Sequence, residues 1–301
     1  MMERITVTND LSFSRIVHGA WRLNDWNYTT EQTVSLIEHC IEQGITTFDH
    51  ADIYGGYTCE ELFGRAIQAN PGLRKRMELV TKCGIVLESP NRPEHKSHHY
   101  NTSKEHIIRS VENSLSSLKT DYIDTLLIHR PDPMMNPEEV AEAFSELKDS
   151  GKVRTFGVSN FKRHQLNMLQ SYLDDKLITN QVEVSAYELE NIQDGTLDLC
   201  MEHRMPVMAW SPLAGGAVFS GNGEKAVRLR DTLTKVGAEL GTEDISEVLY
   251  AWILKHPATI MPIVGSGKTA RIDSAVRALG HKLSLDQWFE ILHASMGHDV
   301  P

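Results

Sequence analysis

Short apolar runs alternate with longer amphipathic stretches along almost the whole chain. The runs are rich in β-branched residues and are bounded by glycine, proline or polar clusters, a pattern typical of buried strands. Eight such runs are present, at residues 15–20, 45–49, 77–82, 123–129, 153–158, 179–184, 206–210 and 259–264.

The amphipathic stretches between these runs carry helix signals. Thr30 stands where an N-cap is expected, ahead of apolar residues at helical spacing. Residues 103–118 and 160–171 show the same spacing. Asn136 followed by a proline predicts the capped start of another helix, and Gly151 predicts its end.

Eight strands, each followed by a helix or a long loop, predict an α/β fold of the (β/α)8 TIM-barrel type. A doubly wound sheet is the main alternative. Two further strands, residues 5–8 and 11–13, predict an N-terminal β-hairpin that closes the bottom of the barrel. The 301 residues would allow two domains. Because no low-complexity linker divides them, we expect a single barrel domain over residues 1–301.

Composition and charge narrow the range of partners. The chain has 30 lysines and arginines against 41 aspartates and glutamates, a formal net charge of −11. Such a surface repels phosphate backbones and anionic lipids, so we expect no nucleic acid and no membrane as partner. The N-terminus shows no apolar signal segment and no run is long enough to span a bilayer, so we expect a cytoplasmic protein. The pattern leaves the oligomeric state open.

Cysteines and histidines give no metal signature. The four cysteines are scattered without a CxxC pair and are expected to be reduced apolar fillers. His95, His98 and His99 lie close together, but the prolines and charges around them indicate an exposed loop at residues 88–102. We therefore expect no metal site.

Polar side chains stand where three of the predicted strands end. Asp49, Lys82 and His129 occupy these ends, which in such a barrel meet on one face. Asp49 is the natural counter-charge for Lys82, and a purely structural ion pair is the alternative reading. Tyr54 follows on the loop above. Lys82 is expected to lower the pKa of this phenol from about 10 and make it a general acid, while His129 orients a carbonyl.

Seven motifs in order along the chain strongly resemble the aldo-keto reductase superfamily. They are residues 48–55 (FDHADIYG), 81–84 (TKCG), 126–132 (LLIHRPD), 157–161 (GVSNF), 180–182 (NQV), 210–213 (WSPL) and 265–271 (GSGKTAR). The Ser-Gly-Lys stretch and the ending at residues 297–301 are most similar to the bacterial YdhF-like oxidoreductases.

The resemblance implies a role for each matching residue. Asp49, Tyr54, Lys82 and His129 match the family's catalytic tetrad, with Tyr54 as the proton donor in NADPH-dependent reduction of aldehydes or ketones. A nicotinamide cofactor would lie across the top of the barrel. The residues that match its binding positions are Gly19, Ala20, Trp21, Asp49, Ser159, Asn160, Gln181, Trp210, Ser211, Leu213, Gly265, Ser266, Gly267, Lys268 and Arg271.

The last loop favours NADPH over NADH. Ser266, Lys268 and Arg271 stand at a predicted helix start, where amides, a hydroxyl and positive charges suit a phosphate. In the family these positions hold the 2′-phosphate. The chain departs from the family at Ser274 and Ala275, where a Glu-Asn pair commonly contacts the adenine.

Four side chains are candidates for the substrate pocket: Trp21, Trp26, Tyr54 and His129. Together with Trp210, the aromatic residues predict an aromatic-walled pocket, which suits apolar or aromatic small-molecule carbonyl substrates. Two other functions stay open. A nicotinamide-binding sensor or accessory subunit on the same barrel would be expected to have a broken tetrad, and a Schiff-base lyase would use Lys82 as its nucleophile.

Overall fold

The eight predicted strands form a closed barrel in the computed structural model, which describes residues 2–300. All neighbouring strands run parallel, and the last strand pairs with the first, so the TIM barrel predicted from the sequence is confirmed. The barrel strands are β3 (Val17–Gly19), β4 (Thr47–Asp49), β5 (Glu78–Cys83), β8 (Ile123–Ile128), β9 (Val153–Ser159), β10 (Asn180–Glu183), β11 (Val207–Trp210) and β12 (Ile260–Val264).

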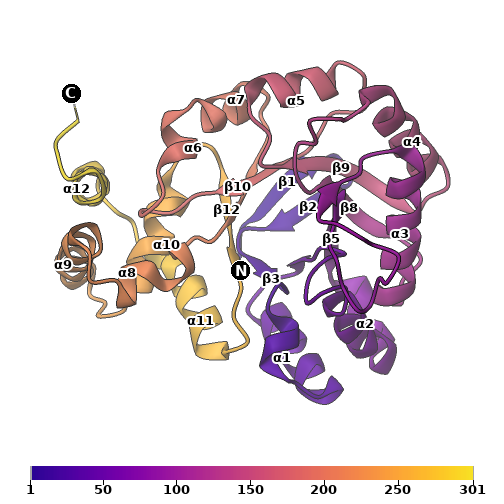
Figure 1. Cartoon of the computed structure of the whole chain (residues 1–301). Helices are drawn as coiled ribbons and strands as arrows, with labels where there is room; N and C mark the ends of the chain where they lie inside the picture. Colours follow the sequence, from indigo (N-terminus) through magenta and orange to yellow (C-terminus); the bar gives the residue numbers. More distant parts are fainter. Residues whose placement is uncertain (1, 301) are drawn as a thin grey trace.

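Helices surround the barrel, as Figure 1 shows. The longer helices bury apolar residues in two core clusters, together with residues of the strands, and carry most of their charged residues on the outside. They are α1 (Thr30–Glu42), α2 (Cys59–Ala69), α3 (Lys104–Leu118), α4 (Pro137–Asp149), α5 (Arg163–Gln170), α6 (Glu190–Gln193), α7 (Thr196–Glu202), α8 (Ala217–Ser220), α9 (Glu224–Leu240), α10 (Ile245–Lys255), α11 (Thr269–Arg277) and α12 (Leu285–Met296), with 3-10 turns η1 (Leu23–Trp26), η2 (Pro71–Arg76), η3 (Ala214–Gly216) and η4 (Ala278–Gly280).

Two predicted helix starts are wrong. The N-cap of α1 is Thr29 and not Thr30, because Thr29 and Gln32 exchange hydrogen bonds between side chain and backbone in a capping box. The helix expected over residues 160–171 begins only at Arg163, since Asn160 adopts a left-handed backbone conformation (φ 61°) that turns the chain out of β9. The start of α4 after Asn136 is as predicted.

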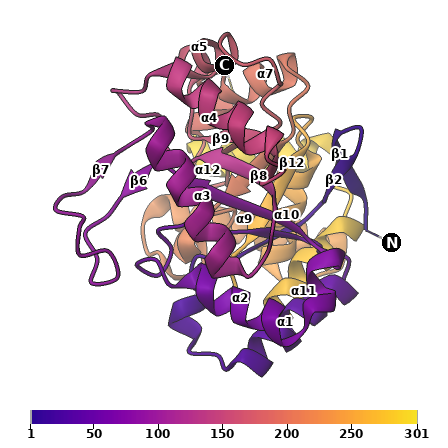
Figure 2. The ribbon, with the colours of Figure 1, turned by 90° about the vertical axis from the view of Figure 1, so that its right-hand side faces the viewer.

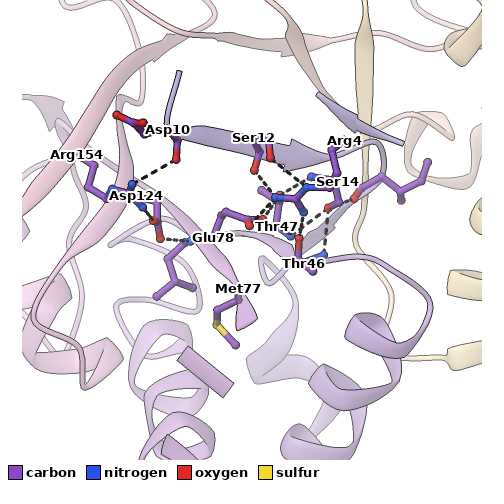
Figure 3. A network of polar contacts seen from close by, with 12 residues as sticks. Arg4, Asp10, Ser12, Ser14, Thr46, Thr47, Met77, Glu78, Asp124 and Arg154 are labelled. Carbon is purple, nitrogen blue, oxygen red and sulfur yellow. Dashed lines mark hydrogen bonds and ion pairs between the residues drawn. The ribbon is translucent and has the colours of Figure 1, made fainter. Parts of the chain in front are cut away.

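The N-terminal strands β1 (Arg4–Thr8) and β2 (Leu11–Ser14) form the predicted hairpin across the bottom of the barrel. Figure 3 shows how it is fixed there. Arg4 donates hydrogen bonds to Ser12 (3.2 Å) and to Glu78 (2.6 Å), and the amide of Ser14 donates to Thr47 (2.9 Å). Glu78 and Thr47 begin β5 and β4, so the hairpin covers the amino ends of the strands.

Apolar side chains fill the barrel and the layer around it. Phe13 of the hairpin, fully buried, packs inside the barrel in one cluster with Val80 and Met208. A larger cluster lies between strands and helices, where Trp252 and Trp288 stack and each donates an indole hydrogen bond to the other's carbonyl. The four cysteines are buried and free, as expected.

One long loop departs from the expected unstructured form. After β5, β6 (Ile85–Val86) and β7 (His99–Tyr100) pair in a short hairpin that we call the arm (residues 85–100). Figure 2 shows the arm projecting beside α3. Within residues 2–300, no helix combines the length and the apolar character that a bilayer crossing requires.

Candidate active site

Three of the four predicted tetrad residues stand at carboxyl ends of barrel strands. Asp49 is the last residue of β4, Lys82 is next to last in β5, and His129 directly follows β8. Tyr54 comes from the loop after β4. Parallel pairing of β4 with β5 and of β5 with β8 brings these ends side by side, so the barrel gathers the residues that the sequence separates.

A buried ammonium group lies at the centre of the site. The Nζ atom of Lys82, a fully buried side chain, lies 2.8 Å from each carboxylate oxygen of Asp49. The same atom donates to the backbone carbonyl of His50 at 2.7 Å and to the Tyr54 hydroxyl at 3.0 Å. Burial works to lower the pKa of Lys82, but Asp49 and Tyr54 raise it overall, so the ammonium stays charged.

The pKa of Tyr54 corrects the expectation from sequence. Burial raises the pKa of this phenol above its ordinary value, Lys82 opposes that rise, and Asp49 adds to it. Lys82 acts in the predicted direction, but the predicted net lowering is wrong, because desolvation of the phenolate outweighs the effect of the ammonium. The phenol is held protonated.

His129 faces Tyr54 in an edge-to-face arrangement, with 5.9 Å between the ring centroids. Burial, Lys82 and Arg130 lower the pKa of His129 well below its ordinary value, so the imidazole is neutral near pH 7. Its Nδ1 atom is buried and has no hydrogen-bond partner within residues 2–300. A neutral ring that offers one N–H beside a phenol can orient a carbonyl oxygen between them.

On the other side of Asp49, polar side chains form a continuous hydrogen-bonded row. Gln181 donates to Asp49 (2.7 Å), and the Ser159 hydroxyl donates to the backbone carbonyl of Gln181 (2.9 Å). Asn160 in turn donates to Ser159 (2.8 Å) and accepts from the indole of Trp210 (3.0 Å). The structure thus brings together Gln181, Ser159, Asn160 and Trp210, four of the residues that match cofactor-binding positions of the family.

Other residues that match cofactor-binding positions lie at the ends of β3 and β11, on the rim of the barrel that carries the carboxyl ends of the strands. The amide of Ala20 donates to the carbonyl of Asp49 at 2.9 Å, next to Gly19, while the Trp21 side chain is 59% exposed. Ser211 turns the chain with a left-handed backbone (φ 49°), and Leu213 packs against both major clusters of the core.

The loop after β12 leads into α11, whose N-cap is Lys268. Lys268 and Arg271, at the junction of the loop and α11, are exposed. The space next to Gly265 in the loop is open, because a Cβ there would meet nothing within 4 Å. The Ser266 hydroxyl accepts a hydrogen bond from the amide of Lys268 (3.1 Å). Open space, free amides of a first helical turn and two cations make this loop suitable for a phosphate group.

Two residues that sequence reasoning missed hold this loop. His18 Nε2 lies 3.1 Å from the carbonyl oxygen of Ser266, and the Tyr28 hydroxyl donates to the carbonyl oxygen of Gly267 at 2.8 Å. Trp26, predicted for the substrate pocket, packs against His18 and over Gly267. Because the partners are backbone carbonyls, no residue type in the sequence marks these contacts.

Among residues 2–300, no group of three or more His, Cys, Asp or Glu side chains is arranged to hold a metal ion. His98 and His99 are exposed, as expected, but His95 is half-buried against Tyr57.

Comparison with known proteins agrees with this geometry. The model of the aldo/keto reductase family matches residues 15–295. The uncharacterized oxidoreductase YcsN of Bacillus subtilis (strain 168) is 65% identical, and the oxidoreductase YdhF of Escherichia coli (strain K12) is 50% identical; each alignment covers 100% of both chains. A 6-dehydroglucose reductase of Agrobacterium fabrum (strain C58 / ATCC 33970) is 43% identical over 99% of this chain and 100% of its own.

Two solved structures have the same fold as this chain. The thermostable aldo-keto reductase Tm1743, in complex with the inhibitor epalrestat, superposes with a TM-score of 0.82 at 27% identity, covering 97% of this chain and 100% of its own. An aldo/keto reductase from Klebsiella pneumoniae in complex with NADP and acetate gives a TM-score of 0.78 at 26% identity, covering 100% and 97%. With its barrel, its motifs and full-length relatives in agreement, this chain is a member of the aldo/keto reductase family.

Proposed function

We propose that the protein reduces small-molecule aldehydes or ketones to alcohols with NADPH, and that Tyr54 is the general acid. The observation that carries this proposal is the hydrogen bond of 3.0 Å between the Lys82 ammonium and the Tyr54 hydroxyl, deep in a site where Asp49 balances the charge. A protonated phenol beside a fixed cation can give up its proton and leave a stabilised phenolate.

Each of the four side chains has a separate role in the proposed reaction. Bound NADPH supplies the hydride. Tyr54 donates its hydroxyl proton to the carbonyl oxygen of the substrate, and Lys82 stabilises the phenolate that remains. The neutral His129 donates a hydrogen bond to the same carbonyl oxygen and fixes its direction. Asp49 keeps the ammonium charged and in place.

The residues of the rim fit a phosphorylated nicotinamide cofactor. Ser159, Asn160 and Gln181 would hold the carboxamide, and Trp210 would lie against the ring. Ser266, Lys268 and Arg271 would hold the 2′-phosphate at the start of α11 (nine residues). The remaining contacts in this proposal are Gly19, Ala20, Trp21, Asp49, Ser211, Leu213, Gly265 and Gly267. The family relative solved with NADP supports this assignment.

For the substrate we propose an aldehyde that carries several hydroxyl groups. Two relatives, 43% and 36% identical to this chain, are named 6-dehydroglucose reductase. At the mouth of the site the half-buried Arg130 lies 5.8 Å from the ring of Trp210, and the half-buried Glu183 pairs with Trp210 in the sheet. Charged groups of both signs beside an aromatic wall favour hydroxyl groups over a purely apolar substrate.

The test is a steady-state assay of nucleotide oxidation with NADPH and with NADH against a panel of carbonyls. Sugar aldehydes and apolar aromatic aldehydes of similar size should both be included. We expect oxidation with NADPH and a higher kcat/KM for the sugar aldehydes. Tight NADPH binding without oxidation across the panel would favour the sensor or accessory-subunit hypothesis, and borohydride trapping of a substrate on Lys82 would favour the lyase.

A further inference from the structure

The loop that carries Tyr54 has an unusual backbone. Three consecutive residues directly after it, Gly55, Gly56 and Tyr57, have φ angles of 60°, 63° and 72°. Glycine adopts this left-handed region freely, but an aromatic residue does so at an energetic cost that its surroundings must offset. A strained conformation of this kind persists only where surrounding contacts determine it, so the contacts of Tyr57 are informative.

The arm supplies contacts at the Tyr57 side chain. The amide of Leu87 donates a hydrogen bond of 2.8 Å to the Tyr57 hydroxyl, and Nδ1 of His95 lies 3.3 Å from the same oxygen. The guanidinium group of Arg92 lies 4.9 Å from the centre of the Tyr57 ring. The ring and the hydroxyl are thus both held by arm residues.

The arm also holds the neighbouring peptide. The carbonyl oxygen of Gly56 accepts from the Asn91 side chain at 2.9 Å and from the Ser89 hydroxyl at 3.1 Å. Within residues 2–300, arm residues 87–99 make hydrogen bonds outside the arm only at Gly56 and Tyr57. These contacts are therefore concentrated on the loop that carries Tyr54.

The arm begins beside another tetrad residue. It leaves β5 three residues after Lys82, and its base is set by the pairing of Ile85 with Tyr100, with the Ile85 side chain buried. Beyond the base, a cavity of about 440 Å³ separates the arm from α3. The arm is thus a bridge between the strand of Lys82 and the loop of Tyr54.

We infer that the arm positions Tyr54 against Lys82 and that Tyr57 is the positioning residue through which it acts. This inference rests on the proposed function. Without the arm contacts the left-handed turn would relax, and the phenol would leave its place 3.0 Å from the ammonium. A displacement of about 1 Å at a reacting group lowers turnover roughly 100-fold.

The first test is Tyr57→Phe, which keeps the ring over Arg92 and removes the hydroxyl contacts. We expect kcat to fall about 10-fold or more while the Kd of NADPH stays within about twofold. Tyr100→Phe is the matched control, because this half-exposed tyrosine of the arm makes no side-chain hydrogen bond within residues 2–300. Unchanged kcat in Tyr57→Phe would overturn the positioning role.

A second pair of substitutions tests the same bridge without touching Tyr57. The double variant Ser89→Ala, Asn91→Ala removes both donors to Gly56, and we expect it to lower kcat in the same direction. If the two variants act through one bridge, their combination should lower kcat by less than the product of the separate effects. Fully multiplicative losses would contradict a shared mechanism.

Amide hydrogen exchange tests the bridge independently of turnover. Tyr57→Phe should speed exchange in peptides that cover residues 53–58 and leave the barrel strands unchanged, and Tyr100→Phe should do neither. If the wild type reduced no carbonyl, the proposed function would fail, and exchange would still decide whether the arm holds the loop. Unchanged exchange at residues 53–58 would overturn the inference even in an active enzyme.

Discussion

The Nζ atom of Lys82 lies 3.0 Å from the hydroxyl oxygen of Tyr54, and burial holds the pKa of that phenol above its ordinary value. Burial and the ammonium act on different protonation states of the phenol. Burial keeps the proton on the resting phenol, while the ammonium stabilises the anion formed once the proton has left.

Replacing Tyr54 by Phe should abolish most turnover and spare cofactor binding. General acid catalysis contributes about 10²–10⁴-fold, so kcat should fall within that range. The Kd of NADPH, measured by calorimetric titration, should stay within about twofold. Tyr172→Phe is a surface control, since Tyr172 is 47% exposed. Losses of equal size in binding and in turnover would contradict the acid role.

The pH profile of reduction should be flat across neutral pH. The active form needs a protonated Tyr54, whose pKa is raised, so kcat/KM should decline only as pH rises beyond about 10. His129, whose pKa is lowered, should produce no loss between pH ~6.5 and ~9. The measurement is kcat/KM for the carbonyl at saturating NADPH. A decline with a midpoint near pH ~8 would show that bound cofactor reverses the effect of burial on the phenol.

Glu60 should make stability depend on pH. It is buried behind the Tyr54 loop, where burial raises its pKa to about 7. The stability that the protonated Glu60 side chain contributes to the fold is fully present below its ordinary pKa of 4.5 and is lost as pH rises through about 7. Over this pH range the free energy of unfolding falls by about 3 kcal/mol. In urea unfolding, Glu60→Gln should therefore gain stability relative to wild type between pH ~5 and ~7.5.

The neighbouring Glu61 provides the control for this experiment. Glu61 is exposed and pairs with Arg65 one turn along α2, which lowers its pKa. The stability of Glu61→Gln relative to wild type should change only slightly with pH, and in the direction opposite to that of Glu60→Gln. A stability difference between Glu60→Gln and wild type that does not change with pH would refute the raised pKa of Glu60.

Gly267 of the loop after β12 and Gly280 at the end of η4 should respond differently to one added methyl group. A Cβ at Gly267 would lie 2.8 Å from the Trp26 ring and 3.0 Å from the Tyr28 hydroxyl, whereas a Cβ at the exposed Gly280 would meet nothing within 4 Å. Gly267→Ala should raise the KM for NADPH about 10-fold or more by displacing the loop from its supports. Gly280→Ala should change this KM less than about threefold. Equal effects would show that contact with Trp26 and Tyr28 does not fix the loop.

Much of the fold was predictable because barrel strands are buried on both sides and read as continuous apolar runs. The gathering of Asp49, Lys82 and His129 on one face was predictable because they stand at the ends of such runs, whereas their catalytic roles stay a proposal. The single-domain organisation over residues 1–301 stays a prediction, and its end residues Met1 and Pro301 lie outside the described residues.

Features that depend on surroundings were harder to predict. The direction of the Tyr54 pKa shift is set by desolvation, which depends on the whole packed site and not on one neighbour. His18 and Tyr28 support their loop through backbone carbonyls, and His95 is half-buried only because Tyr57 turns toward it. None of these contacts follows from residue type or spacing.

The pairing of β12 with β3 has a consequence for synthesis. β3 is made within the first 20 residues, yet one of its two neighbours arrives only with residues 260–264. On the ribosome, a nascent chain that includes β11 but not yet β12 therefore carries an unsealed sheet, with unpaired edges at β3 and β11. The loop proposed to hold the cofactor phosphate follows β12, so nucleotide binding at this loop cannot assist folding until all the barrel strands have been translated.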